Sequence, residues 1–320
     1  MDLYFNDEID PGVWNRLAGD HVFHRYEWRR VIERTYGLRP FFALAIEEDL
    51  FALYPSFQQG KYCLSMPFTY IAGYLGNCAT LRERLARAVC EEGRLDCHRM
   101  LVPLGAGATK ITAIADIGDL EHYRGTLSHK MRNQLKKSEE QGLEFLQTRD
   151  LDFFYPLYCR KMHEHGTPPH KRLFFQLILE SFPAANIFAT LSEGRAVAAM
   201  FCLDGLDAAG REQPTLHILW AASETDSGRV YANYFTYWRS IQTAAARGIH
   251  LVDLGTTRPE SSQHAFKQKW KPLFYGVQES RPRGAALDDR LSARLLSALW
   301  RHSPGWFADT VGPQVRKYLA

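Results

Sequence analysis

The stretch His264-Ala265-Phe266-Lys267-Gln268-Lys269-Trp270 places a lysine among aromatic residues directly after an α/β pattern. That pattern is an amphipathic run from about Arg229 to Arg247, followed by a short apolar strand, 251–254, that ends at Gly255. Helix, strand and a lysine-bearing turn of helix in this order bring a cation to the end of a sheet, where α/β proteins bind ligands. The stretch therefore predicts an α/β fold with a site near Lys267.

Spacing alone leaves two interpretations of Lys267 open. Lysines near the end of a chain are mostly solvated, and a Phe-x-x-x-Trp spacing is mostly core packing. A lysine that works in a cleft is the alternative. The rest of the chain has to decide between them.

Length and composition indicate a globular protein. The chain has 320 residues, too many for one ordinary core, and its 46% hydrophobic and 23% charged content is typical of soluble domains. No apolar run could cross a bilayer, and the acidic start, residues 1–8, lacks a signal-peptide pattern, so we expect a cytoplasmic location. The six cysteines form no C-x-x-C pair, and His163-Glu164-His165 with His170 fits no common ligand spacing, so we expect no metal site.

Both halves of the chain alternate helix and strand signals, which predicts mixed α/β units. In the first half, a hairpin is expected at 41–46 and 50–54, and Thr80 with Glu83 forms a capping box for the next helix. The second half repeats the plan, with helices from Asp150 and near 171–182, a hairpin at 186–192 and 195–203, and a strand at 214–222. The repetition suggests a duplicated fold. Free backbone N–H groups near 228–231 would face an anion.

A basic helix is predicted at the centre of the chain, with Ser128 as its cap and Gly142 at its end. Arg132 and Lys136 share a face, and Lys130 widens the positive surface. Such a face is usually just solvated, but it also suits a polyanion, because arginine and lysine bind phosphate. Both interpretations stay open.

Several of these segments together resemble the FemAB-like transferases of the GNAT acyltransferase superfamily. The segments that carry the resemblance are 127–139, 166–168, 171–175, 233–238, 253–255 and 266–270. The resemblance implies two tandem GNAT-like domains, at 1–118 and 119–280, followed by a basic helical tail at 281–320. It also implies transfer of an acyl or aminoacyl group onto an amine of a cell-envelope precursor or a small molecule. Well-studied relatives take the amino acid from aminoacyl-tRNA and attach it to a peptidoglycan precursor.

The resemblance also implies the site residues. The reacting centre of the family maps onto Phe266 and Lys267, and Asp253 would hold the acceptor ammonium or act as base. Amine attack on an ester or thioester develops an oxyanion that a positioned ammonium stabilises. His217 and Trp220 are further candidates to line the cleft, with core packing the alternative for Trp220. The residues expected to bind substrate are Arg132, Lys136, Lys130, Asn133, Arg229, Tyr231, Asn233, Arg258 and Trp270.

The donor is left open, with no bound cofactor implied. Acyl-CoA-dependent GNAT enzymes carry a glycine-rich loop before the central helix, whereas residues 223–232 hold one glycine and two acids. No long coiled-coil arm, which some tRNA-using relatives have, is evident. The loop counts against acyl-CoA and the missing arm against tRNA, so the residues do not decide the donor. From the resemblance we expect aminoacyl-tRNA, with acyl-CoA used in exopolysaccharide biosynthesis as the alternative. A non-catalytic module that binds an anionic glycan or RNA is a hypothesis from another class. Nothing points to DNA.

The tail, 281–320, holds seven basic and three acidic residues, and leucines recur every fourth position from Leu287 to Leu299. This spacing predicts an amphipathic helix. The helix could pack on the protein's own core, or contact the inner membrane surface, which would suit a lipid-linked acceptor.

Overall fold

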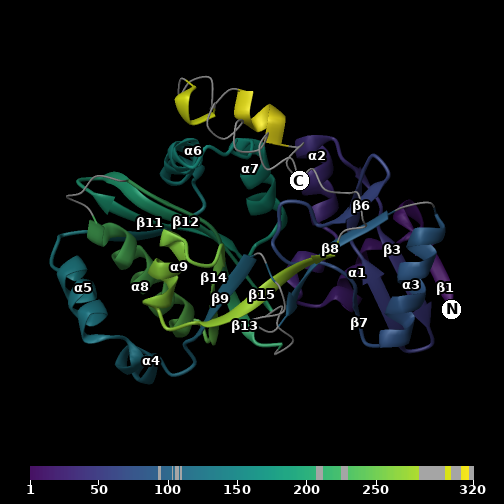
Figure 1. Cartoon of the computed structure of the whole chain (residues 1–320), viewed down its shortest axis with the longest axis horizontal. Helices are drawn as coiled ribbons and strands as arrows, with labels where there is room; N and C mark the ends of the chain where they lie inside the picture. Colours follow the sequence, from purple (N-terminus) through teal and green to yellow (C-terminus); the bar gives the residue numbers. More distant parts are fainter. Residues whose placement is uncertain are drawn as a thin grey trace. The chain divides into compact units, whose positions relative to one another are not determined.

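The computed structural model of the chain describes residues 1–92, 95–102, 104, 108, 110–206, 212–224, 230–280, 300–303 and 311–316 (Figure 1). The described residues fall into two compact units. The first contains the described residues up to 108 together with 276–280, and the second contains Lys110–Tyr275 and the described residues after 299. The domain limits expected from the sequence stay a prediction, while the second compact unit begins at Lys110.

A mixed sheet forms the second unit. Its strands, in spatial order, are β10 (Glu144–Thr148), β11 (Ala185–Ser192), β12 (Arg195–Leu206), β13 (Pro214–Ser223), β14 (Leu251–Thr257) and β9 (Lys110–Asp116). Neighbouring strands run antiparallel except β13 and β14, which are parallel and are joined by a helix. The predicted hairpin and the predicted helix between parallel strands are confirmed. β9 and β10 were not expected.

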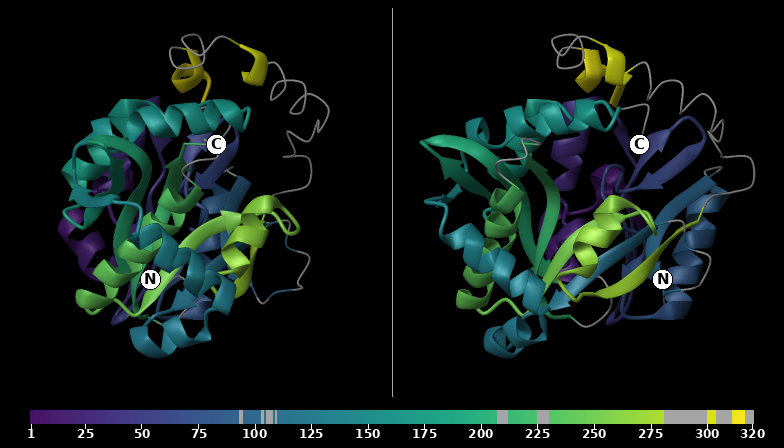
Figure 2. Two further views of the ribbon diagram at one scale, coloured as in Figure 1. Left: turned by 90° about the vertical axis from the view of Figure 1, so that its left-hand side faces the viewer. Right: turned by 60° about the vertical axis from the view of Figure 1, so that its left-hand side comes forward.

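Helices cover both faces of this sheet (Figures 1 and 2). On one face lie α4 (Leu120–Thr126), α5 (His129–Glu139), α8 (Val230–Ala246) and α9 (Ser262–Gln268). On the other lie α6 (Tyr155–Glu164) and α7 (Arg172–Ser181). Side chains alternate along a strand, so Met200 and Cys202 of β12 join the core under α5 and α8, while Phe201 packs with Phe154 and Phe175 on the α6–α7 side.

The first unit contains a sheet of β1 (Asp2–Phe5), β3 (Ala43–Glu47), β4 (Leu50–Tyr54) and β7 (Leu75–Gly76). A second group of strands is β2 (Arg39–Pro40), β5 (Ser56–Gln59), β6 (Tyr62–Ser65) and β8 (Leu95–Val102), on which residues 276–280 of β15 (Leu273–Ser280) pair antiparallel. Its helices among the described residues are α1 (Pro11–Ala18), α2 (Trp28–Tyr36) and α3 (Ala79–Glu91).

The helix caps predicted from the sequence are confirmed at one position and wrong at others. Ser128 Oγ accepts a hydrogen bond from the N–H of Met131 at 3.2 Å, so the predicted cap of α5 is confirmed. The capping box at Thr80 is wrong, because α3 begins one residue earlier and Cys78, at its cap position, makes no side-chain cap bond. Asp150 caps only the short 3-10 turn Leu151–Phe153, because α6 begins at Tyr155.

Two predictions concern residues that the structure does not describe. They are the leucine-rich helix of the tail and the loop with Arg229. Among the helices that are described, none combines the length and the apolar character needed to cross a membrane. The six cysteines are free thiols.

Candidate active site

The parallel strands β13 and β14 separate partway along their length. They pair at Thr215–Leu251, Leu216–Val252 and His217–Asp253, after which β13 continues to Ser223 and β14 to Thr257. Both strands carry an irregularity at this point, since β13 shifts register against β12 after Ile218 and β14 shifts against β9 after Asp253. Ligands of α/β proteins bind at the carboxyl ends of parallel strands, so this point is the candidate active site.

Lys267 of α9 lies at this point. Its side chain is buried, and Nζ donates hydrogen bonds to the carbonyl oxygens of Gly255 at 2.7 Å and Thr256 at 2.9 Å. Burial strips water from the ammonium and lowers the pKa of Lys267 to about 8, against the attraction of Asp253, which raises it. A buried cation with an altered pKa at strand ends is the physical signature expected of a functional lysine.

The backbone around Gly255 explains how both carbonyl groups reach one ammonium. Gly255 has φ of +78°, a conformation that side chains disfavour, and a Cβ at this position would lie 2.9 Å from the carbonyl oxygen of Ile218. The irregularity in β14 at this glycine turns consecutive carbonyl groups toward α9. The predicted end of the strand at Gly255 is thus a bulge, and β14 continues to Thr257.

Asp253 is 1% exposed and bound on several sides. Its Oδ1 accepts hydrogen bonds from Thr112 Oγ1 at 2.8 Å and from the N–H of Gly255 at 2.9 Å. Its Oδ2 lies 3.5 Å from Nδ1 of His217, which is equally buried. A carboxylate this enclosed is poorly placed to hold an acceptor ammonium directly. Thr112 was missed from the sequence, because it lies 141 residues from its partner.

The aromatic neighbours of Lys267 hold α9 in place. Phe266 packs on Tyr237 and Tyr234 of α8 with ring centroids 5.2 and 5.4 Å apart, and Trp270 stacks on Tyr237 at 5.4 Å. Trp270 has 0% exposure and packs in the core, and its expected role in substrate binding stays a prediction. Phe266 is half-buried beside the lysine.

The cations of α5 lie away from Lys267. α5 and α9 both pack on α8, but in Figure 1 α5 lies on the outer side of α8 and α9 lies next to β14. Arg132 turns inward and donates to the carbonyl oxygens of Gly125 and Leu127, so its guanidinium stabilises the α4–α5 connection. Lys130 is exposed, as is Lys136, whose Nζ lies 3.9 Å from Glu140, and exposed Asn133 contacts His129 at 3.4 Å. The structure thus separates these residues from Lys267.

The remaining candidate residues also lie in different surroundings. Tyr231 and Asn233 are half-buried near the start of α8, and Arg258 is exposed between β14 and α9. Trp220 lies in an aromatic cluster with Phe175 at 5.1 Å and His170 at 5.5 Å, which supports its core-packing interpretation.

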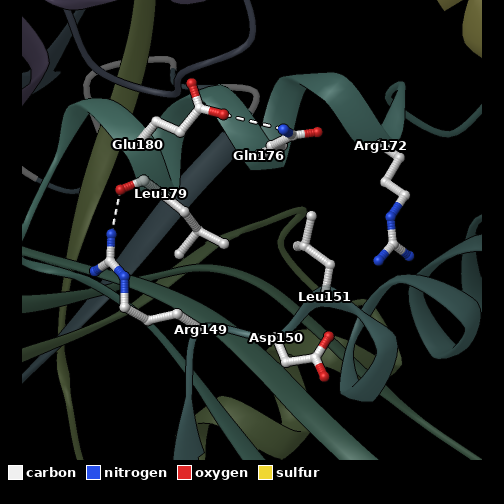
Figure 3. A pocket seen from close by; sticks show the side chains of 7 residues that line it. All are labelled: Arg149, Asp150, Leu151, Arg172, Gln176, Leu179 and Glu180. Atoms are coloured by element: carbon white, nitrogen blue, oxygen red, sulfur yellow. Dashed lines mark hydrogen bonds between the residues drawn. The ribbon is translucent and has the colours of Figure 1, made fainter.

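A separate hollow of about 380 Å³ lies beside α7 (Figure 3). Leu151 and Leu179 point toward its middle, with Arg149 and Arg172 at its sides. Arg149 donates to the carbonyl oxygens of Leu179 and Pro183, and Arg172 pairs with Asp152 at 2.7 Å. The rest of its lining is Asp150, Gln176 and Glu180. This hollow lies beside α7 and not at the carboxyl ends of the parallel strands, so it is a weaker candidate than the Lys267 site.

The histidines near 163–170 do different structural work. His163 Nε2 bonds the carbonyl oxygen of Ser303 at 2.9 Å, and His170 lies buried against Phe174 at 4.6 Å. Burial and nearby Arg316 lower the pKa of His170 well below its usual value. Within the part of the chain that the structure describes, no three metal-binding side chains gather.

Comparison with known proteins agrees with this geometry. Residues 126–268 match the family model of the acetyltransferase (GNAT) domain. No curated protein matches the chain in sequence. Among solved structures, FemX is similar over 93% of this chain and 100% of its own, with a TM-score of 0.63 and 10% identity.

Two further structures show the same tandem fold. L-PGS from Bacillus licheniformis is similar over 87% of this chain and 98% of its own, with a TM-score of 0.56 and 12% identity. A tandem GNAT protein from the clavulanic acid biosynthesis pathway is similar over 88% and 98%, with a TM-score of 0.51 and 8% identity. The predicted tandem GNAT-like fold is therefore confirmed. Residues 126–268 match the acetyltransferase (GNAT) domain family, and the chain as a whole shares its tandem fold with FemX.

Proposed function

We propose that this chain transfers an acyl or aminoacyl group onto an amine at the point where β13 and β14 separate. The observation that carries the proposal is Lys267, a buried ammonium held by the carbonyl oxygens of Gly255 and Thr256 inside the GNAT domain. Acyl transfer requires a fixed positive group where negative charge develops, and this lysine provides one.

The chemistry follows from the donors of the ammonium. Lysine has three N–H groups, and two of them bond the carbonyl oxygens. The third donates to the oxyanion that forms when the acceptor nitrogen attacks the acyl carbon. The new C–N bond forms, the C–O or C–S bond to the donor breaks, and the proton of the amine leaves with solvent or the departing group. With a pKa of about 8, Lys267 is mostly protonated at pH 7.

Direct transfer needs no covalent intermediate. Among the described residues near Lys267, Asp253 and His217 are enclosed, and neither has the exposure of a nucleophile or of a base that reaches substrate. Proximity and orientation of the bound donor and acceptor would then supply much of the rate enhancement.

Aminoacyl-tRNA is the donor that we propose. The proposal is supported by the fold shared with FemX and L-PGS and by the exposed cations Lys130 and Lys136 on α5, which would bind phosphates. The acceptor would be an amine of a cell-envelope precursor, reached from the cytoplasm or from the membrane surface. The acyl-CoA alternative is favoured by the acetyltransferase character of the matched domain family.

The test offers the purified protein a radiolabelled charged-tRNA pool and, separately, a panel of acyl-CoAs, each with cell extract as acceptor. RNase-sensitive transfer of label that fails in Lys267→Ala would support the tRNA donor. Transfer from acyl-CoA alone would support the alternative. Lys269→Ala is the matched control, because Lys269 lies two residues away, is exposed and bonds Tyr234 OH at 2.7 Å. Activity that survives in Lys267→Ala would contradict the proposed site.

A further inference from the structure

Asp253 is contacted by a side chain from each of the two strands that flank it. β14 lies between β13 and β9 in the sheet. From β9, Thr112 donates its hydroxyl to Oδ1 at 2.8 Å. From β13, His217 is the register partner of Asp253 and places Nδ1 3.5 Å from Oδ2. All three side chains are at most 1% exposed.

His217 is itself held in a defined orientation. Its Nε2 lies 3.1 Å from the carbonyl oxygen of Leu206 at the end of β12. A carbonyl oxygen can only accept, so Nε2 carries the proton, and Nδ1 is the ring nitrogen turned toward Asp253. The ring thereby connects β12 to the carboxylate.

The carboxylate in turn shapes the support of Lys267. Its Oδ1 also accepts the N–H of Gly255 at 2.9 Å, across the bulge in β14. The carbonyl groups of Gly255 and Thr256 in that bulge are the groups that bind the Lys267 ammonium. A continuous set of contacts therefore runs from Thr112 and His217 through Asp253 and the bulge to the lysine.

Stability gives little reason for such a network. A buried carboxylate costs free energy unless it is fully bonded, and apolar side chains of similar size are often as stable or more so. Valine or leucine could fill these strand positions, as they do at 252 and 254. A polar network that connects three strands to one lysine is better explained by the geometry that it imposes on that lysine.

We propose that Thr112 and His217 are positioning residues, which hold Asp253 so that the bulge keeps its two carbonyl oxygens on the Lys267 ammonium. They act through Asp253 and the backbone and do not touch substrate. The importance of this positioning for transfer rests on the proposed function, but the positioning itself can be measured without any substrate.

The test titrates Lys267 by NMR of ¹³C-labelled lysine side chains in the full chain, with the Lys267→Met spectrum assigning the signal. The wild-type midpoint is expected near 8. Asp253→Asn should lower it by roughly one unit, because an attractive charge close to the ammonium is removed. Asp253 is the charged group that raises the pKa of Lys267. His217 lies beside Asp253 and affects the pKa of Lys267 through that carboxylate.

The positioning residues are then tested by conservative pairs. Thr112→Val removes the hydroxyl at constant shape and should move the midpoint in the same direction as Asp253→Asn, by roughly half a unit. Thr112→Ser, which keeps the hydroxyl, should restore the wild-type value. His217→Gln should behave like Thr112→Val. The matched control is Thr190→Val, because Thr190 is a fully buried strand threonine in the same sheet, bonded to Thr236 at 2.6 Å.

Wild-type titration of Lys267 in both Thr112→Val and His217→Gln, with Asp253→Asn shifted, would overturn the positioning role. An unshifted Asp253→Asn would overturn it as well. If Thr112→Val does not fold, Thr112→Ser and His217→Gln carry the test. A transfer assay on the same variants should show reduced kcat with little change in KM for the donor. Absence of transfer in the wild type would contradict the proposed function and leave the titration result standing.

Discussion

The lysines of α5 and α9 have opposite surroundings, although both sit on helices of the same unit. The side chain of Lys136 is 75% exposed and its partner Glu140 is 3.9 Å away, whereas Lys267 is 7% exposed and bonds two carbonyl oxygens. Burial lowers the pKa of Lys267 to about 8. The comparison indicates that a dense run of exposed cations provides a surface for polyanions, while a single desolvated cation can take part in a reaction.

Replacing Lys267 should produce the largest effect on transfer. Lys267→Ala is expected to lower kcat by about 10²–10³-fold, the usual loss when one donor to an oxyanion is removed. Lys130→Ala with Lys136→Ala should leave kcat at saturating donor unchanged. Rates measured at saturating donor check both variants, and equal losses in both would remove the distinction between the two helices.

Stability should depend on pH through Lys267 in a defined window. The pKa of Lys267 is about 8 in the folded chain, against an ordinary value of 10.5 for lysine. At pH values between these two, the unfolded chain therefore binds more protons than the folded chain. The free energy of unfolding, relative to Lys267→Met, should therefore rise by roughly 3 kcal/mol from pH 8 to 10.5.

Urea unfolding of both proteins across this range measures that difference. Lys136→Met is the control for the loss of one positive charge from an exposed position. A flat difference between wild type and Lys267→Met would show that the ammonium is not desolvated. Transfer activity is expected to be lost as the pH rises through the same range, because the ammonium of Lys267 loses its proton.

Gly255→Ala should damage the support of Lys267 without touching the lysine. The added Cβ would meet the Ile218 carbonyl oxygen at 2.9 Å in a backbone conformation with φ of +78°, which costs roughly 1–3 kcal/mol. Gly248→Ala is a matched control, because Gly248 has φ of +74° with nothing within 4 Å. The melting temperature and kcat should both fall further in Gly255→Ala than in Gly248→Ala. Equal behaviour of the two variants would argue against the close approach at Gly255.

The α5 surface should give the smallest effect. Lys130→Ala with Lys136→Ala is expected to weaken tRNA binding a few-fold at about 0.1 M salt and to flatten the salt dependence, because each lost phosphate contact reduces counterion release. Arg132→Ala should instead lower stability by about 1 kcal/mol, since its guanidinium bonds the carbonyl oxygens of Gly125 and Leu127. Filter binding at several salt concentrations checks the first variant and urea unfolding the second.

Sequence patterns anticipated much of the second unit. The Ser128 cap, the hairpin that turns at 193–194 and the helix between parallel strands all follow from local rules, and all are present. β9 was missed because its short run from Lys110 to Asp116 is buried on both faces and has no turn partner nearby to reveal it as a strand. For Trp270, spacing does not decide between the substrate and the core, because an indole near a functional lysine can face either.

The sequence by itself determined the hairpin of β11 and β12, the helix between parallel strands, the Ser128 cap and the candidate Lys267, because these depend on side-chain period and on neighbours a few residues apart. Tertiary structure alone decided that Lys267 is desolvated, that Arg132 bonds backbone inside the α4–α5 connection and that Thr112 and His217 meet Asp253. The physical reason is that burial and hydrogen-bond partners depend on which strands become neighbours. In this sheet β14 is flanked by β13 and by β9, and β9 comes from more than a hundred residues away.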